Sequence, residues 1–188
     1  KYCVWSIIEG GEPTSRPDFI ELVRYLHSIN MPTSLITNCS LLHTVDLEKL
    51  KQYVQFITCS IDSVYQEPYC KVRGVSSRIY QRVMENIGLL NESNISHYFN
   101  SVITKFNTDE FIDQTYFDKA KALGSNAVSL TFVEDRADVP YSLLPDRKTM
   151  DKVCESVLNY GKKNSSPQIM IPPEYFEQIL ENGRTNFD

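Results

Sequence analysis

Short apolar runs alternate along the chain with longer segments in which apolar residues recur at helical spacing. The short runs predict strands at residues 3–8, 34–37, 56–61, 97–104 and 127–133. The longer segments predict helices at residues 17–28, 46–53, 78–90, 110–123, 148–160 and 173–181. Strands that alternate with helices favour an α/β protein: a parallel sheet with helices outside it, either open or curled into a barrel.

Polar residues gather where the predicted strands end. They are Glu12, Thr37, Asn38, Ser60, Asp62 and Thr104. The carboxyl ends of parallel strands meet at one edge of a sheet, and α/β proteins bind their ligands at that edge. Turns are polar in any protein, so the pattern leaves open both a ligand-binding edge and ordinary turns.

The turn after the first predicted strand has the sequence Gly10-Gly11-Glu12-Pro13-Thr14. The two glycines let the backbone adopt positive φ and approach a ligand closely. Pro13 fixes its own φ and favours an extended Glu12, which makes the turn stiff. A strand-to-helix turn without a ligand explains the same residues.

Composition narrows the class of protein. With 188 residues, 41% of them hydrophobic, the chain is long enough for one sizeable core. A net charge of −5 argues against a broad nucleic-acid surface. The sequence shows neither a signal peptide nor an apolar run long enough to span a bilayer, so we expect a cytoplasmic protein.

The five cysteines are scattered: Cys3, Cys39, Cys59, Cys70 and Cys154. Their number is odd and no CxxC pair occurs, which favours reduced thiols over a disulfide framework. The three histidines are also far apart in the sequence. The sequence therefore predicts no metal site among its own residues.

Five segments, taken in order, resemble the radical S-adenosylmethionine (radical SAM) family. They are residues 10–19 with Gly-Gly-Glu-Pro-Thr, 36–42 with Thr-Asn-Cys, 57–62, Val72-Arg73-Gly74, and 99–107. The resemblance covers residues 3–135, and we take residues 1–135 as a radical SAM-like partial barrel core. Residues 136–188 are interpreted as a helical tail that leads toward a further C-terminal region.

The resemblance implies a partial (β/α)6 barrel like a TIM barrel. Members of the family use a [4Fe–4S] cluster to cleave S-adenosylmethionine reductively into methionine and a 5′-deoxyadenosyl radical. That radical then removes a hydrogen atom from a substrate. An electron donor such as flavodoxin or ferredoxin is implied as a partner.

Particular residues are implied to bind the cofactor. Gly10, Gly11, Glu12 and Pro13 match the motif that receives the methionine amino group, largely through backbone carbonyls. Thr37 and Asn38 match a Thr-Asn-Gly segment in which Cys39 replaces the glycine. If the positive φ of that glycine is kept, Cys39 is strained.

The remaining matches lie further along the chain. Ser60 and Asp62 match positions near the cofactor's ribose and carboxylate, although Asp62 also suits a turn or a cap. Arg73 lies in a predicted loop, either paired with the methionine carboxylate or simply exposed. Asn100 and Ser101 match positions that face the cofactor.

The family holds its cluster with three cysteines spaced CxxxCxxC before the Gly-Gly-Glu-Pro strand, and that loop is absent here. We therefore expect an internal fragment that lacks the first β/α unit and is inactive on its own. The parent enzyme is expected to carry a cysteine-rich, SPASM-type extension.

Several functions stay open. The tail favours modification of a peptide or protein, and a small molecule or lipid precursor is the alternative substrate. A nucleoside-binding α/β module without chemistry is a rival, which a CxxxCxxC loop upstream would exclude. A phosphate-binding barrel is a weaker rival, because it needs a glycine-rich loop at a helix N-terminus that this chain does not show.

Overall fold

The computed structural model describes residues 5–134 and 143–183, which contain a six-stranded, wholly parallel sheet. Cys3 lies outside these residues. The strands are adjacent in sequence order: β1 (Ser6–Ile8), β2 (Thr33–Thr37), β3 (Phe56–Ser60), β4 (His97–Ile103), β5 (Ala127–Phe132) and β6 (Gln168–Ile169). The predicted α/β class and parallel sheet are confirmed.

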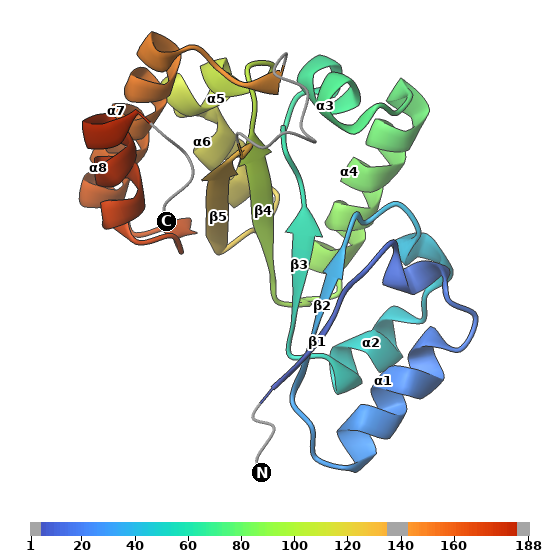
Figure 1. Ribbon diagram of the computed structural model, residues 1–188. Coiled ribbons are helices and arrows are strands. Elements are labelled where there is room, and N and C mark those ends of the chain that lie inside the picture. The colour runs from blue at the N-terminus through green and yellow to red at the C-terminus, as the bar shows by residue number, and fades with distance from the viewer. Residues whose placement is uncertain (1–4, 135–142, 184–188) are drawn as a thin grey trace.

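Helices connect the strands. They are η1 (Pro13–Ser15), α1 (Phe19–Ser28), η2 (Leu42–Thr44), α2 (Leu47–Tyr53), α3 (Gln66–Arg73), α4 (Ser77–Glu92), α5 (Thr108–Ile112), α6 (Thr115–Ala122), α7 (Arg147–Lys163) and α8 (Pro173–Asn182). Figure 1 shows them around the outside of the sheet, with α1 and α2 beside its β1 edge and α7 and α8 at the opposite side. This winding is that of a partial TIM-like barrel.

The strand register gives the sheet two different faces. On the outer face, under the helices, Leu35, Phe99 and Leu130 are fully buried. Successive strand residues point to opposite sides, so the alternate residues form a second face, most of it half exposed. This inner face consists of Trp5, Ile7, Ser34, Ile36, Phe56, Thr58, Ser60, Tyr98, Asn100, Val102, Ala127, Ser129, Thr131 and Gln168.

Three elements differ from the prediction. Residues 66–73 form helix α3, where a loop was expected around Arg73. The single helix expected at 110–123 is two helices, because Gln114 adopts a φ of 67° between α5 and α6. Backbone in the left-handed region cannot continue a right-handed helix. The third difference is β6, a two-residue strand beside β5 that is too short to give a periodic signal.

Helix α7, within residues 143–183, packs closely on the rest of the molecule. Helix α7 buries Val153 and Val157, and its Tyr160 ring stacks on Phe117 of α6 with centroids 4.1 Å apart. The predicted division of the chain at residue 135 stays a prediction. Within the described residues, no helix is both long enough and apolar enough to cross a membrane.

Candidate functional site

The carboxylate of Glu12 joins the end of β1 to the end of β2. Its Oε1 accepts hydrogen bonds from the Thr14 backbone N–H (3.1 Å), the Thr14 hydroxyl and the Thr37 hydroxyl (2.8 Å). Its Oε2 accepts from the Asn38 backbone N–H at 2.8 Å. A carboxylate held by four donors is fixed in place. Glu12 therefore acts as a clamp that sets the shape of this edge.

The turn before Glu12 is open to approach. Gly10 has a φ of 125°, which an L side chain rarely adopts, and both Gly10 and Gly11 are exposed. A Cβ built on either glycine would meet no atom within 4 Å. Pro13 then begins η1, with Glu12 as its N-cap. The backbone carbonyls of the turn are thus accessible to a ligand.

The end of β2 supports this turn. Thr37 is 2% exposed, and its hydroxyl also accepts the Cys39 backbone N–H at 3.0 Å. The Asn38 side chain caps the Ser40 backbone N–H. Cys39 has a φ of 64°, so the left-handed backbone expected of a glycine is kept. Burial raises the pKa of the Cys39 thiol, which makes it a poor nucleophile.

Asp62 and Arg73 form a pair behind the end of β3. Arg73 Nε lies 2.5 Å from Asp62 Oδ2 without an aligned hydrogen bond, and Arg73 Nη2 donates to the Ser60 carbonyl at 2.9 Å. Asp62 Oδ1 accepts the Val102 backbone N–H at 2.9 Å. Burial raises the pKa of Asp62, and the Arg73 guanidinium opposes that shift in part. Arg73 keeps 30% of its side chain exposed, whereas Asp62 keeps 5%.

Ser60 and Asn100 lie side by side on the inner face, in register between β3 and β4. Both are half exposed, and neither side chain makes a hydrogen bond within residues 5–134 and 143–183. Half-exposed hydroxyl and amide groups are suited to binding a polar ligand.

Ser101 does not share this position. It is fully buried on the outer face, where its hydroxyl contacts the Ile61 carbonyl and the Tyr116 hydroxyl. Neighbouring strand residues point to opposite sides, so Asn100 and Ser101 do not share one face of the sheet. The expectation that both contact the cofactor stays a prediction. Ser101 joins the sheet to α6.

Two buried residues that the sequence reading did not single out hold the loop after β3. The Asn107 side chain donates to the carbonyls of Asp62 (2.6 Å) and Val102 (2.9 Å). Glu110 Oε2 accepts the Val64 backbone N–H at 3.0 Å, while its buried Oε1 has no hydrogen-bond partner. The sequence offered one sign of their role, which is that two polar residues, Asn107 and Glu110, follow a predicted strand. Their partners in the loop after β3, Asp62 and Val64, lie 45 and 46 residues away, which only the fold reveals.

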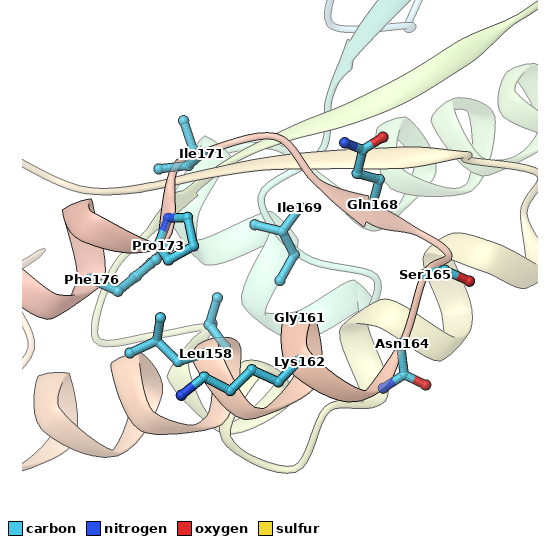
Figure 2. Close-up of a pocket in the computed structure, with 11 residues that line it drawn as sticks. Leu158, Gly161, Lys162, Asn164, Ser165, Gln168, Ile169, Ile171, Pro173 and Phe176 are labelled. Atoms are coloured by element: carbon cyan, nitrogen blue, oxygen red, sulfur yellow. The ribbon is translucent and has the colours of Figure 1, made fainter.

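A pocket of about 220 Å³ lies elsewhere, between α7, β6 and α8 (Figure 2). Apolar side chains such as Leu158, Ile169 and Phe176 line much of it. Neither Ser60 nor Asn100 lines this pocket, and Ile169, which does, belongs to the outer face of the sheet. We therefore place the candidate site at the carboxyl edge of β1–β4 and not in this pocket.

The described residues do not fit an iron–sulfur cluster. No group of three or more His, Cys, Asp or Glu side chains within them could hold a metal ion. Cys39, Cys59 and Cys154 are buried, and Cys70 is half buried on α3.

Comparisons with known proteins identify the family. The model of the Radical SAM superfamily matches residues 1–118. An AdoMet-dependent heme synthase of Methanosarcina barkeri is 34% identical over 128 residues, which are 68% of this chain and 36% of that protein. A probable GTP 3′,8-cyclase of Saccharolobus islandicus is 27% identical over 181 residues, 93% of this chain and 58% of that protein.

The fold has solved counterparts. SuiB of Streptococcus suis superposes with a TM-score of 0.72 at 19% identity, over 97% of this chain and 43% of SuiB. SuiB has also been solved with S-adenosylmethionine and with the precursor peptide SuiA. The chain thus spans between about a third and three fifths of these relatives. The family match over residues 1–118 shows that the chain belongs to the radical SAM superfamily.

Proposed function

We propose that the full-length protein cleaves S-adenosylmethionine to a 5′-deoxyadenosyl radical, and that this chain binds the cofactor. The family implies S-adenosylmethionine and a [4Fe–4S] cluster. When bound, the cluster supplies one electron, which breaks the bond between sulfur and C5′ and leaves methionine. Within the described residues, no group of three or more His, Cys, Asp or Glu side chains could hold such a cluster. We also propose that residues 1–188 alone do not cleave the cofactor.

One observation carries this proposal: the accessible Gly10-Gly11 turn, Arg73, Ser60 and Asn100 belong to the same edge of the sheet. The cofactor has an ammonium, a carboxylate and two ribose hydroxyls. The carbonyls of the glycine turn suit the ammonium, because it needs acceptors. Arg73 suits the carboxylate, and Ser60 and Asn100 suit the carboxylate or the ribose.

The other predicted residues act one step further back. Glu12, Thr37 and the Asn38 backbone N–H hold the glycine turn, and Asp62 orients Arg73. We propose them as positioning residues. Pro13 stiffens the same turn.

For the substrate we propose a peptide or protein. SuiB, whose fold this chain shares, has been solved with its precursor peptide. A small molecule or lipid precursor is the alternative, because the curated relatives are named for heme and GTP chemistry. Flavodoxin or ferredoxin is the proposed electron donor, and the cytoplasm the proposed location.

The test is anaerobic reconstitution of the full-length protein with iron and sulfide. A chemical reductant and S-adenosylmethionine are added, and 5′-deoxyadenosine is quantified. We expect 5′-deoxyadenosine from the wild type. If no 5′-deoxyadenosine forms in a preparation that holds a complete cluster, the proposed cleavage is wrong. The chain would then be a nucleoside-binding module without chemistry.

A pair of variants locates the cofactor. Asn100→Ala should weaken S-adenosylmethionine binding about tenfold, because it removes one or two hydrogen bonds to a charged or polar group. Gln168→Ala, an exposed position on the far edge of the sheet, should leave the affinity unchanged. Equal affinities in the two variants would remove Asn100 from the site.

A further inference from the structure

The inner face continues from the candidate site across β4 and β5. In register, Asn100 lies beside Ser129, and Val102 lies beside Thr131. All four are half exposed. A substrate held next to a cofactor at Ser60 and Asn100 therefore meets this part of the sheet.

The described part of the inner face carries no Asp, Glu, Lys, Arg or His. At the neighbouring edge, the carboxylate of Glu12 is held by four donors, and Asp62 is paired with Arg73. A charged substrate group on this face would lose its water without gaining an opposite charge. Such burial is costly.

Apolar surface lies open on the same face. The rings of Trp5 and Phe56 stack with centroids 5.5 Å apart, and those of Phe56 and Tyr98 are also 5.5 Å apart. Trp5 is 41% exposed and Ile7 is 58% exposed. This row lies toward the amino ends of the strands and is exposed at Trp5 and Ile7 and half buried at Phe56 and Tyr98. Aromatic and aliphatic groups that reach the surface together favour an apolar partner.

We infer that the part of the substrate lying on the inner face is an uncharged, largely apolar peptide segment. This inference rests on the proposed function and makes its substrate class specific. It sets this chain apart from enzymes whose substrates are polyanions. A nucleoside triphosphate requires cations, which the described inner face does not offer.

The test is selection of a randomised heptapeptide library on the full-length, reconstituted protein with S-adenosylmethionine bound. Charged residues should be depleted about tenfold in the selected peptides, because each one would be buried without a partner. GTP, titrated against the same preparation, should not bind. Selected peptides rich in acidic or basic residues, no selection at all, or tight binding of GTP would each overturn the inference.

Two variants show whether the inner face is responsible. Thr131→Lys places a cation on it and should shift the selection toward acidic peptides, whereas Thr131→Val keeps it neutral and should not. If Thr131→Lys does not fold, Ser129→Lys replaces it. A lysine variant that selects the same peptides as the wild type would place the substrate elsewhere.

The same preparation is assayed for 5′-deoxyadenosine. If the product forms but the peptide results go against the inference, only the inference fails. If no product forms, the proposed function fails as well.

Discussion

At the scale of single residues, the central group is the Glu12 carboxylate. The motif it belongs to is visible in the sequence, and its resemblance to a cofactor-binding turn suggested contact with the ligand. The structure instead directs both oxygens to Thr14, Thr37 and Asn38. Two of these partners, Thr37 and Asn38, lie at the end of the next strand, 25 and 26 residues away, so the sequence alone could not show the clamp.

Glu12→Gln tests the clamp. The glutamine side chain has the same shape, but one of its two oxygen positions becomes an NH2 group. That group must face either the Asn38 N–H or the three donors that Oε1 now accepts, so two donors point at each other. We expect the free energy of unfolding to fall by about 1.5–3 kcal/mol and S-adenosylmethionine affinity to fall with it. Urea unfolding and cofactor titration measure the two effects.

Glu21→Gln is the matched control, because Glu21 is exposed on α1. It should change stability by less than about 0.5 kcal/mol. If Glu12→Gln behaves like Glu21→Gln, the hydrogen bonds of Glu12 do not hold the edge.

Cys39 carries a second prediction at this scale. Its φ of 64° strains any residue with a Cβ, by about 1 kcal/mol. Cys39→Ala and Cys39→Gly both lose the buried thiol, but only glycine relieves the strain. We therefore expect the glycine variant to be the more stable of the two by about 1 kcal/mol in urea unfolding.

Cys59 supplies the comparison, since it is equally buried but lies in strand β3 with ordinary backbone. There, alanine should be more stable than glycine. The same order at both positions would mean that the backbone of Cys39 is not strained.

At the scale of elements, the loop between β3 and α3 is held from the side by α5. Glu110, on α5, binds the Val64 backbone N–H, and Asn107 binds the Asp62 carbonyl. This bracing fixes the start of α3 and, with it, Arg73. Helix α3 itself was not predicted, because apart from Tyr69 it buries little and has few apolar residues to mark a stripe.

Glu110 makes this bracing sensitive to pH. Burial raises its pKa from 4.5 to about 7. Between these values the unfolded chain loses the proton while the folded chain keeps it. The contribution of Glu110 to the free energy of unfolding is therefore largest below pH 4.5. It falls as the pH rises toward 7 and stays constant above that.

Glu110→Gln should abolish this loss. The wild type should lose at most about 3 kcal/mol relative to the variant between pH 4.5 and 8. Urea unfolding of both proteins across that range gives the difference. Parallel curves at all pH values would show that Glu110 titrates normally in the folded chain.

At the scale of the whole molecule, the class and the parallel sheet were predictable, because five apolar runs alternate with helical segments. The gathering of polar residues at one edge followed from the parallel arrangement. What could not be predicted was the side to which each strand residue points. Asn100 and Ser101 are neighbours in sequence, yet one faces the open sheet and the other the core.

The account as a whole places S-adenosylmethionine at the carboxyl edge of β1–β4. Hydrogen–deuterium exchange of the full-length protein, with and without the cofactor, tests this most directly. We predict slower exchange on binding for the backbone amides of residues 9–16, 36–41 and 60–65, and no change in residues 161–176 around the pocket of Figure 2. Protection confined to residues 161–176 would contradict it.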